Sequence, residues 1–503
     1  MYISTRDNFQ AVSAAEAIKL GMVPTGGLFV PQNIPAFSEK DLCSLVGKTY
    51  QEIAAKVLAL YLDDYTSGEI AGCIYNAYRE NFAHKKITPL HQLTDRAYIL
   101  ELWHGPTAAF KDMALQLMPH LLSLALQKLQ VTEEMVILVA TSGDTGKAAL
   151  EGFKNVHGLR IICFYPYKGV SQIQERQMVT TEGENTYVVG VEGNFDDCQN
   201  AVKALFADES FRSFLMEKDF ALSSANSINW GRLLPQIVYY VFAYINLLKE
   251  EKIELGEKIN FVVPTGNFGN ILAAWYARQM GLPIHKLICA SNENKVLTDF
   301  FHTGIYEKNR LFKQTISPSM DILISSNLER FLFEMTGRDA GSITSWMKDL
   351  QELGRFTVGD SVQKSISEIL WAGFSTEEET KATIKETYTE NGYTLDTHTA
   401  VGMKVYQQYL AETGDETVTV LDATASPFKF TASVLQALTG SPPTCEDRED
   451  EADEFSLLKE LSREIGLPIH QALQDLEKKP ILHERVCAKE EIKEEIMNIL
   501  RID

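Results

Sequence analysis

The sequence has no C-x-x-C pair, although it contains seven cysteines, at positions 43, 73, 163, 198, 289, 445 and 487. Structural zinc sites usually take their ligands from such closely spaced pairs, so we expect no metal site. An odd number of scattered cysteines is also not the pattern of a disulfide framework. The cysteines therefore favour a reduced compartment, and we expect a cytoplasmic protein.

Long apolar runs and an excess of positive charge are missing as well. The most apolar stretch, 233–248, is interrupted by Pro235 and is too short to cross a membrane. The first residues lack the apolar centre of a signal peptide. The formal net charge of −21 argues against a nucleic-acid partner, because phosphate backbones attract clustered Lys and Arg. We expect a small-molecule partner, neither membrane nor nucleic acid, and the oligomeric state stays open.

The chain has 503 residues, 45% of them hydrophobic, which is long enough to form several domains, each with its own hydrophobic core. Residues 1–95 read as an N-terminal helical domain, with helical spacing over 11–20 and 50–62. After residue 95, short apolar runs alternate with helical patterns, and this alternation predicts an α/β fold with parallel sheets. Strands are expected at 97–102, 135–140, 159–165, 186–191, 258–263, 285–290 and 417–421.

The predicted core spans 96–440, and its smaller subdomain covers roughly 112–225. Residues 441–503 form a C-terminal addition that opens with a strongly acidic loop. Closing helices are expected over 456–476 and 490–500.

One lysine stands in an unusual setting. Lys111 follows the break at Gly105-Pro106 and precedes an apolar-periodic run. We expect a helix to open near Thr107, which would place the lysine in the first turn, where the helix dipole opposes an ammonium and lowers its pKa. A neutral amine is the form that makes a Schiff base with an aldehyde such as pyridoxal phosphate (PLP). The alternative is an ordinary surface lysine.

In parallel α/β sheets ligands bind beyond the carboxyl ends of the strands, so the strand-to-helix loops are the expected place for a site. The first unusual loop, 141–147, combines hydroxyl residues with two glycines and can approach an anion closely. It differs from a P-loop in spacing, and Ala148 replaces the Ser or Thr that binds Mg²⁺. An ordinary capping loop, served by Asp144 or Thr145, is the alternative.

Two further loops have the composition of anion sites. Loop 223–232 gathers amides, hydroxyls and Arg232 where a long helix is expected to begin, near Asn229. Its guanidinium suits phosphate, although a capped helix with a surface arginine would have the same pattern. Loop 264–270 has two glycines before a helix expected over 271–280, so backbone N–H groups can hold an oxyanion without a lysine. It lacks the G-x-G-x-x-G pattern and acidic partner of NAD-binding loops.

These stretches together resemble the threonine synthases, a PLP-dependent family of fold type II, the tryptophan-synthase-β-like class. The family pattern H-G-P-T-x-A-F-K-D matches residues 104–112, S-G-D-T-G matches 142–146 and P-T-G-N-F-G-N matches 264–270. N-S-I-N-x-x-R matches 226–232, and T-A-H-P-A-K-F is similar to 424–430. The resemblance implies two parallel-sheet domains that clasp PLP, with helical additions at both ends.

The resemblance also implies a role for each matched residue. Lys111 would carry PLP as an internal aldimine and then act as the proton shuttle. The other cofactor-binding residues would be Asp144 near the ring hydroxyl, Thr424 at the pyridine nitrogen, and the phosphate-binding backbone of Gly266, Asn267, Phe268, Gly269 and Asn270. The substrate-binding residues would be Ser142, Thr145, Asn226, Ser227, Asn229 and Arg232.

Some positions depart from the family pattern or receive no role. Ser426 stands where histidine is common, so any role of that imidazole is lost or altered. The run 317–322 is similar to the family's S-P-S-M-D-I, and we assign no chemistry to it. His398 is expected to be a structural capping residue. Thr397, Thr25 and Asp7 replace the usual Pro, Asp and Gly.

The implied enzyme is a PLP-dependent carbon–oxygen lyase acting on phosphate: threonine synthase, which converts O-phospho-L-homoserine and water to L-threonine and phosphate by β,γ-replacement. A neutral hydroxyl at Thr424 makes PLP a weaker electron sink than a carboxylate would, which suits elimination and replacement. A threonine-synthase-like phospho-lyase, giving a 2-oxo acid, ammonia and phosphate, would need the same lysine and loops. A non-catalytic PLP-binding protein is a third possibility, against which the intact Lys111 argues.

Overall fold

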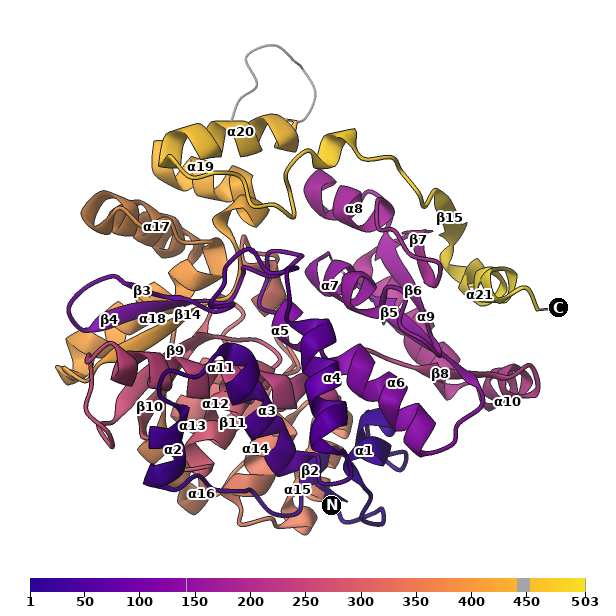
Figure 1. Ribbon diagram of the computed structural model, residues 1–503, viewed down its shortest axis with the longest axis horizontal. Helices are drawn as coiled ribbons and strands as arrows, with labels where there is room; N and C mark the ends of the chain where they lie inside the picture. Colours follow the sequence, from indigo (N-terminus) through magenta and orange to yellow (C-terminus); the bar gives the residue numbers. More distant parts are fainter. Residues whose placement is uncertain (142, 441–452, 503) are drawn as a thin grey trace.

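The computed structural model describes residues 1–141, 143–440 and 453–502, and two sheets organise most of them (Figure 1). The larger sheet has the strand order β13-β10-β9-β14-β4-β3, and its pairs are parallel except β3 with β4. The smaller sheet has the order β15-β7-β6-β5-β8 and is parallel throughout. The predicted α/β fold with two parallel-sheet halves is therefore confirmed.

Both faces of the larger sheet are covered by helices, which explains its unbroken apolar strands. Phe261 and Val263 pack in one cluster with α11 and α12, whereas Val262 between them packs in another with α18. The strands are β3 (Leu90–Gln92), β4 (Ala97–Glu101), β9 (Ile259–Pro264), β10 (Ile284–Ser291), β13 (Leu370–Phe374) and β14 (Thr419–Ala423). The helices nearby are α11 (Trp230–Lys249), α12 (Gly269–Gln279), α13 (Val296–Thr303), α16 (Asp360–Ile369), α17 (Glu377–Asn391), α18 (Thr397–Thr413) and α19 (Thr431–Thr439).

The smaller sheet is sandwiched in the same way. Ile137 packs toward the main core, whereas its neighbours Val136 and Leu138 pack with α9, α10 and α21 on the other face. The strands are β5 (Glu134–Ala140), β6 (Leu159–Pro166), β7 (Thr186–Glu192), β8 (Phe220–Ser223) and β15 (Arg485–Ala488). The helices are α5 (Asp112–Leu115), α6 (Met118–Lys128), α7 (Asp144–Phe153), α8 (Gln172–Val179), α9 (Phe195–Ala207), α10 (Glu209–Glu217) and α21 (Ile492–Leu500), whereas α20 (Glu454–Ile465) packs with α18 and α19.

The N-terminal residues form a helical unit that packs on α11 through aromatic contacts. Tyr50 meets the edge of Tyr78 and of Phe242, with ring centroids 5.2 Å apart in both pairs. This unit contains β1 (Tyr2–Ser4), α1 (Ala14–Leu20), β2 (Phe29–Pro31), α2 (Glu39–Leu45), α3 (Tyr50–Tyr61) and α4 (Ser67–Ala77). A further small region carries β11 (Ile305–Glu307), η1 (Pro318–Met320), α14 (Leu328–Met335), α15 (Ala340–Glu352) and β12 (Arg355–Thr357).

Each predicted strand is present within two residues of its expected bounds, but the C-terminal prediction was partly wrong. The helix expected over 456–476 ends at Ile465, because Gly466 takes the left-handed conformation (φ 68°) and Pro468 follows. The chain then adds β15 to the edge of the smaller sheet, beside β7. That strand is only four residues long, too short for its alternation to be recognised in the sequence. The last helix, α21, begins at Ile492.

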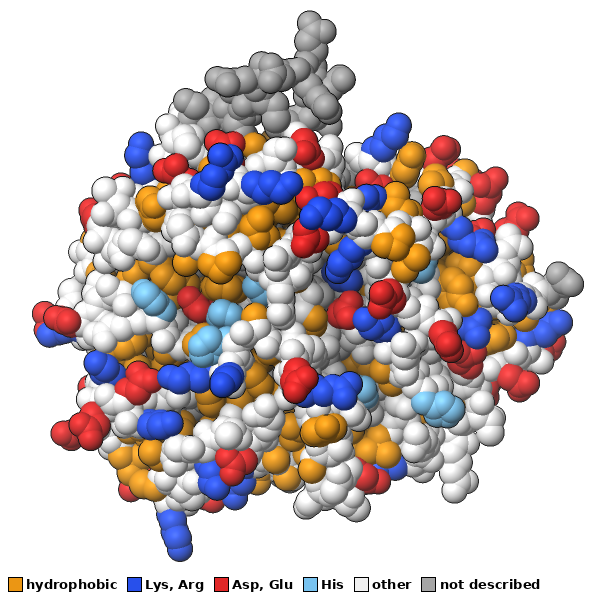
Figure 2. Space-filling model, turned by 45° about the horizontal axis from the view of Figure 1, so that its top comes forward, with side chains coloured by type: hydrophobic (Ala, Val, Ile, Leu, Met, Phe, Trp, Pro, Cys, Tyr) orange, Lys and Arg blue, Asp and Glu red, His pale blue; other side chains and the backbone are white. Residues whose placement is uncertain are grey.

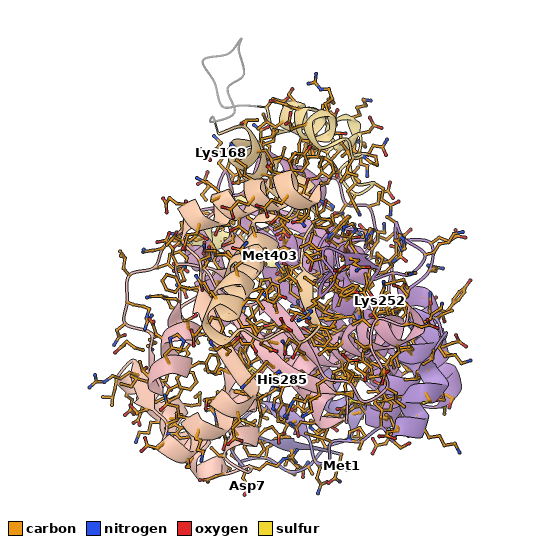
Figure 3. All side chains as sticks on the ribbon, turned by 90° about the vertical axis from the view of Figure 1, so that its left-hand side faces the viewer. Met1, Asp7, Lys168, Lys252, His285 and Met403 are labelled. Carbon is orange, nitrogen blue, oxygen red and sulfur yellow. The ribbon has the colours of Figure 1, made fainter. Side chains whose placement is uncertain are left out.

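The surface agrees with an acidic, mixed-charge protein. On the face shown in Figure 2, basic and acidic side chains are intermingled over most of the elements. Figure 3 shows Met403, on α18, among the side chains packed over the larger sheet, whereas Met1 and Asp7 lie at the edge of the molecule. Within the described ranges, none of the helices combines the length and the apolar character needed to cross a membrane.

Candidate active site

Loops from both sheets meet where β4, β5, β9 and β14 end, as expected for a parallel α/β fold. The loop after β4, which carries Lys111, is tied to the loop after β14. The N–H of Phe110 donates to the carbonyl of Thr424 at 2.8 Å, and the N–H of Ser426 donates to the carbonyl of Ala108 at 3.0 Å. These bonds fix the lysine relative to the larger sheet.

The lysine loop is longer than predicted, and the helix begins at Asp112 rather than near Thr107. Ala108 takes a left-handed conformation (φ 61°), which interrupts a helix at that point. The carboxylate of Asp112 accepts hydrogen bonds from the N–H and the hydroxyl of Thr107, at 2.8 and 2.7 Å. A Cβ on Gly105 would lie only 2.4 Å from that carboxylate, so this turn requires glycine.

Lys111 itself is buried at the start of α5. Its Nζ donates to the hydroxyl of Ser319 at 3.0 Å and lies 3.7 Å from Oδ2 of Asp144. Burial lowers the pKa of Lys111 to about 8, the charges of Lys429 and Arg232 act in the same direction, and Asp144 opposes them. The predicted lowering of the pKa is confirmed, but its main cause is burial rather than the helix dipole.

The loop after β9 forms a cup of backbone N–H groups at the start of α12. Its carbonyls are held from outside: that of Gly266 accepts from the Ser325 hydroxyl at 2.7 Å, and that of Asn267 accepts from Asn327 at 3.0 and 3.1 Å. No acceptor among the residues that the structure describes takes the N–H groups of 266–270. Phe268 holds the turn in a left-handed conformation (φ 63°). Such a cup fits a phosphate group.

The Asn270 side chain braces this cup instead of facing a ligand. Its Oδ1 accepts from the Thr265 hydroxyl at 2.6 Å, and its Nδ2 donates to the carbonyl of Pro264 at 2.9 Å. The side chain of Asn270 thus stabilises the loop, and its backbone N–H is left for an anion, which is the role that the resemblance implied.

The loop after β5 brings Asp144 to the same place. Gly143 lies in a conformation open to glycine (φ 136°), and the hydroxyl of Thr141 accepts from the N–H groups of Gly143 and Gly146, both at 2.9 Å. Helix α7 begins at Asp144, not near 147, and neither Asp144 nor Thr145 caps it. Thr145 lies half-buried in its first turn. Ser142, expected to bind substrate, lies outside the described residues.

Asp144 is nearly enclosed by donors. Its Oδ1 accepts from Lys429 Nζ at 2.8 Å and from Gln174 Nε2 at 3.2 Å, while Oδ2 faces Lys111. Burial alone would raise the pKa of Asp144, but the charges of Lys429 and Lys111 outweigh it and hold the pKa well below its usual range.

The first turn of α11 holds a buried arginine, Arg232, that has no counter-ion among the described residues. Nη1 of Arg232 donates to the carbonyl of Ala225 at 2.7 Å, whereas its Nε has no hydrogen-bond partner in the described ranges of the chain. No carboxylate within the described residues forms an ion pair with this guanidinium, and burial lowers its pKa to about 10. A buried, unpaired guanidinium is costly unless an anion binds it, so the geometry supports a ligand phosphate at this place.

The other residues of loop 223–232 that were predicted to bind substrate differ in their burial and hydrogen bonding. Asn229 caps α11: its Oδ1 accepts from the N–H of Gly231 at 2.8 Å, and its Nδ2 donates to the carbonyl of Ile18 at 2.8 Å. Both ends of its side-chain amide are therefore engaged in holding the loop in place. Asn226 is exposed, and the hydroxyl of Ser227 lies 3.3 Å from that of Ser326.

The loop after β14 lies against the lysine loop, as the hydrogen bonds of its backbone show. Thr424 is buried, and its N–H donates to the hydroxyl of Thr399 at 3.3 Å. Two residues earlier, Asp422 is buried with Oδ1 unpaired and Oδ2 accepting from Tyr240, and burial raises the pKa of Asp422 to about 8. The hydroxyl of Ser426 is buried and has no hydrogen-bond partner in the part of the chain that the structure describes.

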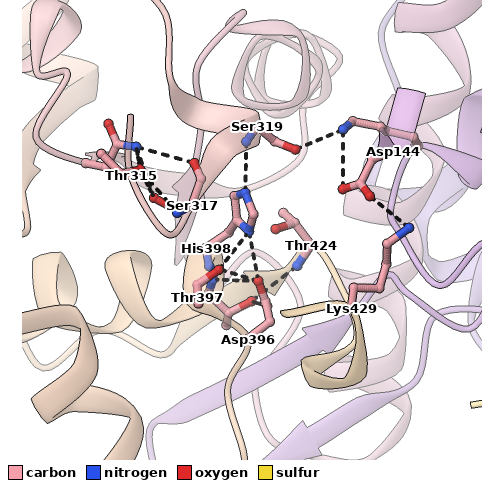
Figure 4. Close-up of polar contacts among 12 residues, drawn as sticks. Asp144, Thr315, Ser317, Ser319, Asp396, Thr397, His398, Thr424 and Lys429 are labelled. Atoms are coloured by element: carbon pink, nitrogen blue, oxygen red, sulfur yellow. Dashed lines mark hydrogen bonds and ion pairs between the residues drawn. The ribbon is translucent and has the colours of Figure 1, made fainter. Parts of the chain in front are cut away.

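The prediction missed a hydrogen-bond chain that reaches Lys111 through Ser319 (Figure 4). The Ser319 N–H donates to Nε2 of His398 at 3.1 Å, and Nδ1 of His398 lies 3.1 Å from Asp396. Acceptance at Nε2 places the imidazole proton on Nδ1, toward the carboxylate. Asp396, not His398, caps α18, so the predicted capping role of the histidine was wrong. A carboxylate two residues before a histidine was the signal available in the sequence.

Lys429 was missed as well. It lies after β14, within η2 (Pro427–Phe430), and is buried. Its Nζ forms an ion pair with Asp144, which begins α7 in the smaller half. Its position in the pattern similar to T-A-H-P-A-K-F was visible in the sequence, but its partner 285 positions away was not.

Comparison with known proteins identifies relatives of this arrangement. A family model described as "Threonine synthase N terminus" matches residues 1–78, one described as "Pyridoxal-phosphate dependent enzyme" matches 83–361, and one described as "Threonine synthase, C-terminal" matches 399–494. The human protein "Threonine synthase-like 1" is 41% identical over 99% of this chain and 67% of its own length. This chain thus spans about two thirds of that relative.

Two further relatives carry the name threonine synthase itself. The protein of Pseudomonas aeruginosa is 39% identical over 88% of this chain and 91% of its own length. The crystal structure of PLP-bound threonine synthase from Brucella melitensis superposes with a TM-score of 0.87 at 36% identity, covering 99% of this chain and 98% of that one.

Proposed function

The chain belongs to the threonine synthase family of PLP-dependent enzymes, and we propose that it converts O-phospho-L-homoserine and water into L-threonine and phosphate. Enzymes of this family are lyases acting on phosphate esters. The specific substrate is inferred from the residues around Lys111, and the observation that carries it is the buried, unpaired guanidinium of Arg232.

The residues present fit PLP. Lys111 offers a buried amine with a lowered pKa, and the cup at 266–270 offers free N–H groups for the cofactor phosphate. Asp144 and Thr424 would face the ring. When bound, PLP supplies an electron sink that stabilises negative charge next to the substrate amino group.

Once the lysine amine is free, its chemistry is proton transfer. Lys111 would take and return protons at the α- and β-carbons of the substrate, and its pKa of about 8 suits this exchange near neutral pH. The Ser319 hydroxyl, 3.0 Å from Nζ, would keep the amine oriented.

A second phosphate must be bound away from the cup, because the substrate carries its own. Arg232 would bind the γ-phosphate with Asn226, Ser227 and Thr145, and Asn229 would hold this loop in place. An anion there satisfies the free Nε and compensates a buried charge, whereas an uncharged substituent would leave both uncompensated. We therefore assign specificity for a phosphorylated amino acid to this loop.

A phospho-lyase that releases a 2-oxo acid, ammonia and phosphate is the second candidate. Ser426, where histidine is common in the family, favours it: its hydroxyl is buried without a partner and cannot exchange a proton as an imidazole does. If that imidazole helps to direct water to the β-carbon, this chain lacks the group.

Product analysis separates the candidates. The PLP-loaded protein is incubated with O-phospho-L-homoserine, and phosphate, amino acids and 2-oxo acids are quantified. Threonine equal to phosphate supports the synthase, and 2-oxobutanoate equal to phosphate supports the lyase. Release of no phosphate would contradict both and favour a PLP-binding protein without turnover.

A further inference from the structure

A second buried lysine joins the two halves of the site. Nζ of Lys429, from the larger sheet, donates to the carbonyl of Thr107 at 3.1 Å and to Oε1 of Gln177 on α8 at 3.2 Å. Its third contact is Oδ1 of Asp144 on α7, at 2.8 Å. All three donors of this ammonium are therefore in use, and they connect the lysine loop with two helices of the smaller half.

Asp144 is shared unequally between two lysines. The contact with Lys429 is a short ion pair, whereas Oδ2 and Nζ of Lys111 are 3.7 Å apart, beyond ordinary hydrogen-bond length. The amide of Gln174 adds a second donor on the side of Lys429. Lys429 and Gln174 thus hold one oxygen of the carboxylate, and the other oxygen faces Lys111; Figure 4 shows the contact of Asp144 with Lys429.

We propose that Lys429 is a positioning residue of the active site, which engages the Asp144 carboxylate so that Lys111 is left without a tight ion pair. A carboxylate bonded directly to Lys111 would stabilise its ammonium, which cannot attack an aldehyde. With Lys429 in place, Asp144 can face the bound cofactor without inactivating the lysine that bonds it. This inference rests on the proposed function only in taking Lys111 as the lysine that bonds PLP.

The charged groups around Lys111 predict the direction in which its pKa changes when each neighbouring charge is removed. Asp144 favours the ammonium form of Lys111, whereas Lys429 and Arg232 oppose it. His398 contributes to lowering the pKa of Asp144. Removing the charge of Lys429 ends one repulsion and frees Asp144 to approach Lys111, so both effects raise the pKa of Lys111. Removing the charge of Asp144 lowers it. Removing both should leave the pKa near its starting value, because the two changes have opposite signs.

The test uses the full chain, stripped of cofactor, as wild type and as K429M, K429R, D144N and the double variant K429M/D144N. Trace labelling of Lys111 with acetic anhydride, quantified by peptide mass spectrometry from about pH 6 to about pH 10, gives the midpoint at which its amine becomes reactive. We expect K429M to raise that midpoint by about one pH unit, which lowers the neutral fraction near pH 7 about tenfold. D144N should lower it, and K429R should leave it near wild type.

The double variant separates charge from structure. It loses the same contacts to Thr107 and Gln177 as K429M, so a purely structural role predicts the same behaviour in both. Our inference predicts a midpoint near wild type in the double variant. An unchanged or lowered midpoint in K429M, or a double variant that behaves like K429M, would overturn it.

The proposed function is tested separately in the same proteins. PLP is added, and the absorbance of the cofactor bound to Lys111 is followed at each pH. Failure of the wild type to bond PLP would contradict the proposed function, while the labelling midpoints would still decide the inference about Lys429.

Discussion

Replacing Arg232 by methionine should weaken the binding of the phosphorylated substrate while leaving PLP bound. Charged hydrogen bonds contribute about 1.5–3 kcal/mol each, so loss of the guanidinium should raise KM for O-phospho-L-homoserine about 10- to 150-fold. We place the cofactor phosphate in the separate cup at 266–270, so the absorbance of bound PLP should not change. Steady-state phosphate release and PLP absorbance, measured in parallel, check both expectations.

The same substitution should not destabilise the free protein. Burial lowers the pKa of Arg232 from 12.5 to about 10, which corresponds to a cost of about 3 kcal/mol for keeping the charge in the folded state. For a cation whose pKa is depressed by folding, that cost is fully present below the folded pKa, and therefore at neutral pH. Methionine removes the cost and loses about 1 kcal/mol from the bond to Ala225.

Thermal unfolding in phosphate-free buffer measures the net effect. With PLP bound, so that the cup at 266–270 is occupied, we expect the midpoint of R232M to equal or exceed that of wild type, and inorganic phosphate to stabilise wild type but not the variant. R232K is the matched control, since it keeps a positive charge but loses the planar guanidinium. It should bind the substrate weakly, as R232M does, and its unfolding midpoint should not rise. A variant that loses PLP while keeping its KM would show that we have exchanged the two phosphate sites.

Three further changes probe the remaining parts of the site. K111A should lose the absorbance of bound PLP and turnover together; turnover without bound PLP would refute the role of Lys111. In G266A the new Cβ would lie 3.2 Å from the backbone of Ser319 and Met320, so PLP affinity in equilibrium titration should fall about tenfold, and an unchanged affinity would count against the cup. H398F should lower kcat about tenfold because the Ser319 N–H loses its acceptor, whereas H398Q, which can accept at its carbonyl, should recover part of it; equal kcat in both variants would refute this role.

The strands and the loops of the candidate site could be predicted from sequence because their signals are local. The apolar run at 259–264 follows from burial of both faces, and the two glycines of 264–270 follow from the close approach that a backbone cup requires. The lowered pKa of Lys111 was also predictable in direction. Its cause was not, because burial of Lys111 depends on elements that close over it from the larger sheet and from 317–320.

The missed residues share one property: their partners are distant in the chain. Lys429 forms an ion pair with Asp144 at the start of α7 in the smaller half. His398 accepts a hydrogen bond from Ser319, which lies in a short helical turn without a recognisable sequence pattern. Each residue has an ordinary local explanation, as a charged residue after a strand or as part of a helix start. The pairing is created by tertiary structure, so a single sequence contains no signal for it.

The arrangement also shows how a chain with a net charge of −21 could bind the two phosphate groups of the proposed reaction. The charges that act on the amine of Lys111 are one carboxylate, Asp144, and two further cations, Lys429 and Arg232. Since Asp144 is paired with Lys429, the guanidinium of Arg232 remains uncompensated, and in a buried site its field is screened far less than surface charges are. The other phosphate, which we place in the cup, would need no side-chain charge, because oriented N–H groups at the start of α12 supply the positive potential. Added salt should therefore weaken substrate binding much less than it would in a protein that captures phosphates with surface lysines, and a steep loss of kcat/KM between about 0.05 and 0.5 M potassium chloride would contradict this account.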